Sequence, residues 1–120
     1  MKTKRAASVA ILALVAGVAL SGPAMADPSQ CPANRVCLFS DSNYVGLLGY
    51  RQAGLGLANL SSGANDKLTS WINKTTTNAR WYVDANGGGG CNNMMSNDED
   101  AALSFWDDNA ASSWATNGKC

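Results

Sequence analysis

A repeat with an offset of 43 residues is the feature of this sequence that most restricts its fold. Displacing the chain by this offset aligns the string "NDKLTSW", Asn65 to Trp71, with "DNAASSW", Asp108 to Trp114, and requires no gap. An internal repeat indicates two copies of one supersecondary unit that stack to bury a shared core. We therefore predict two tandem motifs, at residues 36–77 and 79–120. The matched positions are mainly aromatic, glycine and small polar residues: Phe39 with Tyr82, Asp41 with Asp84, Asn43 with Asn86, Gly46 with Gly89, Leu60 with Leu103, Ser61 with Ser104, Ser70 with Ser113 and Trp71 with Trp114.

Each motif is predicted to form four short strands. Short apolar stretches are separated by turn residues, and no segment sustains the 3.6-residue period of a helix. Eight strands in two motifs favour an all-β fold, a Greek-key sandwich of two sheets. The run Gly87–Gly90 is interpreted as a hairpin tip, with a flexible linker as the alternative. The predicted strands are Val36–Ser40, Val45–Arg51, Leu55–Ser61, Leu68–Ile72, Arg80–Asp84, Met94–Met95, Leu103–Trp106 and Ser113–Ala115.

The first 26 residues have the features of a secretory signal peptide. Three basic residues within the first five positions precede a short apolar run, and the A-x-A pattern of Ala24 to Ala26 follows it. The apolar run is shorter than the ~20 residues that a membrane-spanning helix needs. We therefore expect cleavage after residue 26 and release of residues 27–120 as one secreted, extracellular domain with no membrane attachment.

Charge and histidine content exclude several classes of function. Three of the nine basic residues lie in the predicted signal peptide, so the mature chain has six Lys and Arg against nine Asp and Glu and a net charge of −3. No basic stripe is present for a nucleic acid to bind. The chain also lacks His, which zinc hydrolases normally use and which Ser-His-Asp and Cys-His nucleophiles require.

Four cysteines remain after the predicted cleavage: Cys31, Cys37, Cys91 and Cys120. Export to an oxidising compartment makes two disulfides the expected state. Three pairings are possible, and we favour Cys31 with Cys37, which closes a local loop, and Cys91 with Cys120, which ties down the C-terminus. A metal site made only of Cys is the alternative, although the chain contains no C-x-x-C pair.

Two strings in the repeat resemble the signatures of βγ-crystallin domains. "FSDSNYVG", Phe39 to Gly46, resembles their folded-hairpin signature, and both "NDKLTS" and "DNAASS" resemble their calcium signature. The resemblance covers essentially the whole mature chain and implies a βγ-crystallin-like Greek-key sandwich. The second hairpin departs from the pattern, because Gly87 stands where the second aromatic residue belongs; this hairpin is expected to be looser.

The same resemblance implies up to two Ca²⁺ sites. Ca²⁺ takes six to eight oxygen ligands, and turns of this kind offer hydroxyl, carboxylate and carbonyl oxygens. The resemblance gives the hydroxyl ligands to Thr69 and Ser112, with Asp41 and Asp84 as candidates for an acidic ligand from the opposite hairpin. The alternative is that these residues only form turns. The implied main-chain carbonyl positions are Asn65, Lys67, Asp108 and Ala110.

The start of the mature chain, "CPANRVCLF", is similar to that of secreted microbial metalloproteinase inhibitors with a βγ-crystallin fold. This similarity implies a monomeric peptidase inhibitor whose partner is an extracellular protease. The disulfide-held reactive loop of such inhibitors has two closely spaced Cys, and Cys91 has no near partner. The reactive loop of that family therefore cannot be carried over to this chain. We predict separately that a bridge from Cys91 to Cys120 stiffens residues 87–96 as an inhibitory loop, in which Met94 and Met95 contact the protease. Core packing of the Met pair is the alternative.

Two other functions are weighed against inhibition. One is a structural, calcium-binding or antifungal cell-wall-binding protein, because exposed indole rings can stack on sugars. Trp71 and Trp114 are expected in the core, so Trp81 and Trp106 are the Trp residues that remain for such stacking. A glycosidase, which needs two carboxylates flanking the bond, is the other. An acidic run in a loop is more often solvated surface, so we expect no enzyme. The clustered carboxylates are Asp98, Glu99, Asp100, Asp107 and Asp108.

Overall fold

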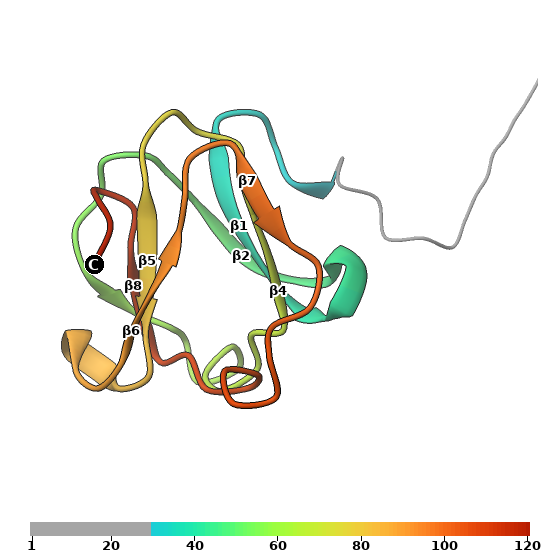
Figure 1. Cartoon of the computed structure of the whole chain (residues 1–120), viewed down its shortest axis with the longest axis vertical. Coiled ribbons are helices and arrows are strands. Elements are labelled where there is room, and N and C mark those ends of the chain that lie inside the picture. Colours follow the sequence, from blue (N-terminus) through green and yellow to red (C-terminus); the bar gives the residue numbers. More distant parts are fainter. Residues whose placement is uncertain (1–29) are drawn as a thin grey trace, which may run out of the picture.

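Two antiparallel sheets of four strands each face one another in a sandwich (Figure 1). The computed structural model describes residues 30–120, and the predicted signal peptide at residues 1–26 lies outside the described residues. In chain order the elements are β1 (Arg35–Asp41), η3 (Ser42–Tyr44), β2 (Val45–Gln52), β3 (Ala58–Asn59), β4 (Ser70–Asn73), β5 (Ala79–Tyr82), η4 (Ala85–Gly87), β6 (Cys91–Met94), β7 (Asp98–Asp100) and β8 (Ser113–Ala115). None of the helical turns in this part of the chain has the length and apolar character needed to span a bilayer.

Each sheet takes three strands from one motif and one strand from the other. The order is β2-β1-β4-β7 in the first sheet and β3-β8-β5-β6 in the second. β3, from the first motif, pairs with β8 and places Ala58 opposite Trp114. β7, from the second motif, pairs with β4 and places Trp71 opposite Asp100. This exchange confirms the predicted Greek-key sandwich of two four-stranded motifs.

The prediction of a strand at Leu103–Trp106 is wrong, whereas every other predicted strand overlaps an observed one. The third strand of motif two is the acidic segment Asp98–Asp100, which pairs along β4 with Glu99 opposite Ile72. Leu103 instead donates its backbone N–H to the carbonyl of Thr69 at 2.8 Å, and the chain then turns. Backbone pairing with β4, rather than the apolar content of the segment, therefore decides where this strand forms.

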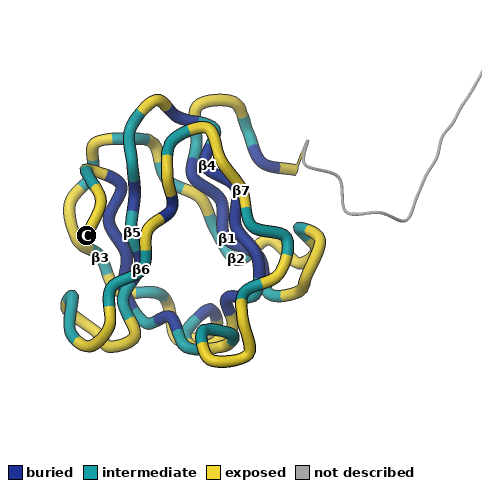
Figure 2. The backbone as a smooth tube through the Cα atoms, viewed as in Figure 1, coloured by how far each residue is buried: buried dark blue, intermediate teal, exposed yellow. Residues whose placement is uncertain are grey.

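A core of large side chains fills the space between the sheets. Figure 2 shows that the buried residues lie mainly along the strands. Trp71, Trp81 and Trp114 are all buried there, with exposed fractions of 5% or less. Each comes from a strand at the centre of its sheet, and strand alternation points these rings inward. The expected core positions of Trp71 and Trp114 are confirmed, and Trp81 joins them. The rest of the core consists of Val36, Leu38, Leu68, Ala79, Met94 and Ala111.

Arg51 bridges the two sheets at a position where the repeat places Met94 in the second motif. Its guanidinium lies 5.2 Å from the ring centre of Trp114. It also donates to the carbonyls of Trp114 at 3.2 Å and Gly56 at 2.7 Å. Burial lowers the pKa of Arg51 from its ordinary value, but an arginine keeps its charge across the physiological range.

A second apolar cluster covers the outer face of the first sheet. It is formed by the Cys31–Cys37 disulfide with Phe39 and Ile72, and Tyr44 packs against it. The rings of Phe39 and Tyr44 meet edge to face with centres 5.9 Å apart. Both predicted disulfides are present, because Cys91 and Cys120 are also bonded. The second disulfide ties the C-terminus to edge strand β6.

The second sheet has a more polar outer face at the equivalent positions. Tyr82 and Ala115 stand where the first motif has Phe39 and Ile72, and the guanidinium of Arg80 lies 5.7 Å from the ring centre of Tyr82. Arg80 also donates to the side-chain oxygen of Asn117 at 2.8 Å, close to the C-terminus. The outer face of motif two is therefore closed by hydrogen bonds and a cation–π contact, where motif one uses a buried cluster.

The two hairpins have the same backbone conformation despite their different residues. Asn43 and Asn86 both lie in the left-handed region, with φ of 58° and 57°. The next residue is Tyr44 with φ of 63° in one hairpin and Gly87 with φ of 75° in the other. A left-handed conformation is strained for Tyr and free of strain for Gly. The second hairpin therefore loses an aromatic ring without losing its backbone path.

A buried serine from the fourth strand fixes each hairpin in place. Ser70 donates its hydroxyl to the carbonyl of Asp41 at 2.6 Å and accepts the N–H of Tyr44 at 3.1 Å. Ser113 makes the matching bonds in motif two, to Asp84 at 2.7 Å and from Gly87 at 3.0 Å. Both serines are fully buried. We call these two residues the serine clamps.

Candidate functional site

The turns that precede β4 and β8 lie against one another at one end of the sandwich, the lower end in Figure 1. We call residues 61–69 and 104–112 the paired turns. The N–H of Asp66 donates to the carbonyl of Ala111 at 2.9 Å, and the N–H of Asn109 donates to the carbonyl of Leu68 at 2.9 Å. Asp66 and Asn109 both take φ near +60°. The paired turns are therefore joined by the same contacts in both directions.

Each hydroxyl predicted as a calcium ligand meets a carboxylate from the opposite motif. Thr69 donates to Oδ1 of Asp108 at 2.6 Å. Ser112 contacts Oδ1 of Asp66 at 3.3 Å. The structure thus brings six of the eight predicted metal-site residues to the paired turns, and it adds the carboxylate of Asp66, which the sequence reasoning missed. The repeat could have indicated Asp66. It aligns Asn65 with Asp108, and at the next position it aligns Asp66 with Asn109.

The four residues predicted to offer main-chain carbonyls all lie within the paired turns. The N–H groups of Asn65 and Asp108 donate to the carbonyls of Ser61 and Ser104, each at 2.9 Å, which closes both turns in the same way. Lys67 and Ala110 each follow a left-handed residue. Lys67 is exposed, and Ala110 is half-buried against the core.

The carboxylates of Asp41 and Asp84 lie over their own hairpins. Oδ2 of Asp41 accepts from the hydroxyl of Ser40 at 3.3 Å. Oδ2 of Asp84 lies where a Cβ on Gly89 would approach it to 2.8 Å, and the positive φ of Gly89 also favours glycine there. Among residues 30–120 no hydrogen bond joins either carboxylate to Thr69 or Ser112, whose hydroxyls bond to Asp108 and Asp66 instead. Asp66 and Asp108 are the carboxylates that hydrogen-bond to the two hydroxyls, and the ligand roles of Asp41 and Asp84 stay predictions.

The oxygen atoms of the paired turns fit a hard cation better than a soft one. Among residues 30–120 no group of three His, Cys, Asp or Glu side chains is placed to hold a metal ion. A cation at either turn would therefore rely on one carboxylate, one hydroxyl and main-chain carbonyls. Ca²⁺ accepts such a mixed set of oxygens, whereas zinc prefers nitrogen and sulfur.

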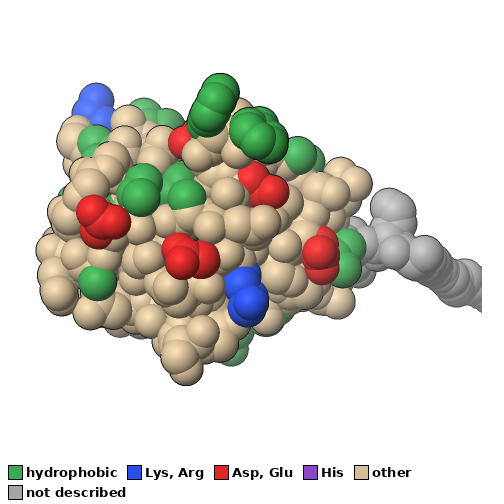
Figure 3. Space-filling view, turned by 90° about the horizontal axis from the view of Figure 1, so that it is seen from below, with side chains coloured by type: hydrophobic (Ala, Val, Ile, Leu, Met, Phe, Trp, Pro, Cys, Tyr) green, Lys and Arg blue, Asp and Glu red, His purple; other side chains and the backbone are tan. Residues whose placement is uncertain are grey.

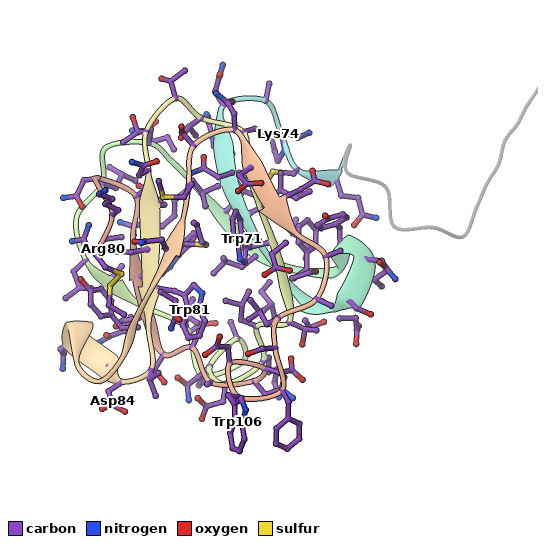
Figure 4. All side chains as sticks on the ribbon, in the orientation of Figure 1. Trp71, Lys74, Arg80, Trp81, Asp84 and Trp106 are labelled. Atoms are coloured by element: carbon purple, nitrogen blue, oxygen red, sulfur yellow. A yellow bond between two sulfur atoms is a disulfide. The ribbon has the colours of Figure 1, made fainter. Side chains whose placement is uncertain are left out.

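Two aromatic side chains project from the second of the paired turns. Phe105 is 84% exposed and Trp106 is 83% exposed. Their rings meet edge to face, with centres 5.3 Å apart and planes at 81°. Figure 4 shows Trp106 pointing away from the body of the molecule, in contrast to Trp71 and Trp81 between the sheets. Seen from this end, Figure 3 shows apolar side chains standing out from the surface with acidic side chains beside them.

The predicted inhibitory loop, residues 87–96, forms the hairpin between β5 and β6 and the start of the segment after it. The glycine run is the hairpin tip, as predicted, because Val83 and Asp84 donate to the carbonyls of Gly90 and Gly88. Cys91 opens β6 opposite Tyr82. Met94 is wholly buried and cannot contact a protease, whereas Met95 is 38% exposed.

The misassignment of Met94 follows from strand alternation. Met94 is the last residue of β6 and lies opposite Ala79, so its side chain faces the other sheet. The next side chain, Met95, points to the opposite side. Of the Met pair, only Met95 therefore remains available as a surface contact.

The acidic segment at β7 forms one edge of the first sheet. Glu99 accepts a hydrogen bond from the hydroxyl of Tyr44 at 2.9 Å. Burial, this hydrogen bond and the nearby charges of Glu99, Asp100 and Asp98 raise the pKa of Tyr44 to about 12. Charged side chains on an edge strand also discourage pairing with another chain. These carboxylates thus have a structural role at the edge strand.

Comparison with known proteins identifies both the fold and the family. The βγ-crystallin domain from Flavobacterium johnsoniae matches with a TM-score of 0.55 and 24% identity, over 67% of this chain and 90% of that one. A βγ-crystallin from Ciona intestinalis gives 0.57 and 19%, over 68% and 98%. A βγ-crystallin domain from Clostridium beijerinckii gives 0.56 and 21%, over 68% and 94%. No curated protein matches significantly.

The sequence model of "Peptidase inhibitor family I36" matches residues 24–94, which is more than half of the chain. The match includes the Cys31–Cys37 loop, the first motif and the second hairpin, and it ends before β7 and the Phe105–Trp106 turn. It confirms that the chain is not an enzyme. On a βγ-crystallin scaffold, the chain belongs to peptidase inhibitor family I36.

Proposed function

We propose that this chain is a secreted, monomeric inhibitor of extracellular metallopeptidases. The observation that carries the proposal is the match of residues 24–94 to a peptidase inhibitor family. The two disulfides fit an extracellular protein, because such bonds persist in oxidising compartments. The metallopeptidase target is supported by the similarity of the segment "CPANRVCLF" to the start of secreted microbial metalloproteinase inhibitors.

A rigid scaffold suits this function. An inhibitor that is already ordered before binding avoids the entropy cost of ordering its contact surface. One disulfide holds the segment before β1, and the other ties the C-terminus to β6. The strand exchange between the sheets adds a second restraint on both motifs.

An inhibition assay of the purified mature chain tests the proposal. The panel contains thermolysin-type metallopeptidases and subtilisin-type and chymotrypsin-type serine peptidases, each assayed with an excess of inhibitor. We expect inhibition of at least one metallopeptidase and weaker or no inhibition of the serine enzymes. Inhibition confined to the serine peptidases would contradict the metallopeptidase target, and no inhibition across the panel would contradict the function itself.

We further propose that the paired turns bind Ca²⁺ and that the ion stiffens this end of the molecule. The support is the placement of Thr69 beside Asp108 and of Ser112 beside Asp66. The carbonyls of Lys67 and other turn residues would complete the oxygen set. Sites with few carboxylates in extracellular modules bind Ca²⁺ with dissociation constants on the order of 10⁻⁴ to 10⁻³ M.

Calorimetric titration with Ca²⁺ tests this second proposal. Thr69→Val and Ser112→Ala each remove one hydroxyl, so each variant should lose one of two binding events and keep the other. Titration with Mg²⁺ is the control, since Mg²⁺ demands a stricter octahedral geometry and sheds its water reluctantly. If millimolar Ca²⁺ gives no heat of binding and no rise in melting temperature, calcium binding is ruled out.

A further inference from the structure

The Phe105–Trp106 pair is the most exposed apolar feature in the described part of the chain. The other large apolar side chains that reach the surface are at most 49% exposed, and most of them lie on or beside strands. Burying an aromatic side chain that is exposed in the free protein yields a large favourable free energy. Two adjacent aromatic rings held in solvent are therefore a strong indication of a partner.

The first of the paired turns shows that the fold does not need these rings. The repeat aligns Phe105 with Ser62 and Trp106 with Gly63. Both turns are nevertheless closed by the same bonds: Ala64 and Asn65 donate to Ser61, and their counterparts Asp107 and Asp108 donate to Ser104. A serine and a glycine thus support the same backbone, and the aromatic pair contributes to something other than folding.

The turn that carries the rings is held in place before any partner arrives. Ser104 donates its hydroxyl to Oδ2 of Asp107 at 3.1 Å. Asp108 is held by Thr69, and the N–H of Asn109 by the carbonyl of Leu68. A partner would therefore have to order only the two side chains, which keeps the entropy cost of binding low.

The shape of the pair favours a concave apolar partner. The two ring planes stand at 81° to one another, so they do not form the flat platform on which a glycan surface stacks. A ring at the tip of a convex turn fits a pocket that closes around it. Peptidases bind their substrates through pockets of this kind. The flanking carboxylates of Asp107 and Asp108 favour a basic rim on the partner.

We propose that Phe105 and Trp106 are the residues by which this chain occupies an apolar specificity pocket of its target peptidase. The inference rests on the proposed inhibitory function and names the contact segment for it. The turn lies outside residues 24–94, the part matched by the family, so the assignment comes from the geometry of this chain. It replaces Met94 as the apolar contact, because Met94 is buried.

The test exchanges the residues of the two turns. In the variant F105S/W106G the second turn receives the residues of the first. In the matched control S62F/G63W the first turn receives the aromatic pair, and a Cβ on Gly63 meets no atom within 4 Å. The wild type and both variants are assayed against the same peptidase panel, and their melting temperatures are measured to confirm folding.

We expect F105S/W106G to raise the inhibition constant by about 30-fold or more, as the loss of an interface hot spot does. The control S62F/G63W should inhibit like the wild type. If the wild type inhibits and F105S/W106G inhibits equally well, the contact segment is wrong and the inhibitory function stands. If the wild type inhibits no peptidase of the panel, the function and the inference fall together.

A second measurement uses the wild-type sequence and does not depend on the folding of a substituted variant. Labelling with 5-fluorotryptophan gives one ¹⁹F resonance for each of the four Trp residues, and only Trp106 is exposed. Binding of an inhibited peptidase should shift the Trp106 resonance and leave those of Trp71, Trp81 and Trp114 nearly unchanged. An unshifted Trp106 resonance in an inhibited complex overturns the inference. The inference is also overturned if soluble cell-wall oligosaccharides shift the Trp106 resonance while no peptidase does.

Discussion

The hairpin of motif one contains Tyr44 at the position where the hairpin of motif two contains Gly87, yet both follow the same backbone path. The common elements are a left-handed Asn and a serine clamp, which are present in both motifs. The aromatic ring is thus not needed to form the hairpin. In motif one it serves instead to close the second apolar cluster and to contact Glu99.

The two motifs also differ in where they place their apolar side chains. Motif one buries Phe39 and Ile72 on its outer face beneath the Cys31–Cys37 disulfide. Motif two leaves its outer face polar and exposes Phe105 and Trp106 at the end of the sandwich. The additional buried cluster therefore lies in motif one, and the exposed aromatic pair lies in motif two.

Of the changes that test this comparison, removing each disulfide in turn should have the largest effect on the free energy of unfolding. In the chain-entropy model, loss of the Cys91–Cys120 bond, with a separation of 29 residues, costs roughly 3 to 4 kcal/mol. The same model gives roughly 2 kcal/mol for Cys31–Cys37, with a separation of 6 residues. Urea unfolding of C91A/C120A and C31A/C37A measures both. If C31A/C37A is the less stable variant, packing of the second cluster outweighs loop length.

The serine clamps should give the next largest effect. Ser70→Ala and Ser113→Ala each leave a hairpin N–H and a carbonyl without their buried partner, which costs about 1 to 3 kcal/mol. We expect the larger loss for Ser113→Ala, because Gly87 offers no ring to hold the second hairpin. Equal losses in urea unfolding would show that the aromatic cluster adds nothing to the stability of the first hairpin.

The Tyr44–Glu99 contact, which joins the hairpin of motif one to β7 of motif two, predicts a pH dependence of stability. The folded-state pKa of about 12 exceeds the ordinary value of 10.0 because the protonated hydroxyl is favoured. Its contribution to stability is therefore complete below pH 10 and is lost as the pH rises toward about 12. Tyr44→Phe should flatten this alkaline decline in the urea midpoint.

Tyr50→Phe serves as the control for the alkaline experiment, because Tyr50 is exposed and lies on the same sheet. It should leave the decline as steep as in the wild type. An absorbance titration of the wild type should show a late tyrosine ionisation, which Tyr44→Phe should remove. The assignment of Tyr44 fails if Tyr44→Phe leaves that late ionisation in place.

The smallest effect on stability is expected from the exchange of the paired turns. Surface substitutions that remove no buried contact usually change the free energy of unfolding by no more than about 0.5 kcal/mol. Both F105S/W106G and S62F/G63W should fall within that range in thermal unfolding. A loss well above it for F105S/W106G alone would mean that the aromatic pair packs against motif two and supports its fold.

Much of the fold follows from the sequence because the repeat fixes several positions at once. Gly46 and Gly89, which the repeat aligns, both take a positive φ, and both disulfides pair as favoured. The strand at β7 was not predicted because its residues are charged and the strand exists through pairing with β4. The apolar content of Leu103–Trp106 misled the prediction, since only Leu103 of this segment packs against the core.

The candidate site was predictable only in part, and the reason is geometric. Thr69 and Ser112 are located by the repeat, but the carboxylates that face them depend on how the two turns cross. That crossing brings Asp66 and Asp108 to the hydroxyls and leaves Asp41 and Asp84 over their own hairpins. Likewise, which member of the Met94 and Met95 pair faces solvent depends on strand register, which composition does not reveal.

The exchange of β3 and β7 between the sheets makes the chain equivalent to a strand-swapped dimer whose two subunits have been fused. A chain containing one motif would form three strands of one sheet, and its fourth strand would have no sheet to join. Two copies of that chain could exchange their fourth strands and so complete both four-stranded sheets. Each disulfide lies within one half of the chain. Fragments separated within residues 74–78 would therefore have no covalent link, and their reassembly would provide a split version of the protein.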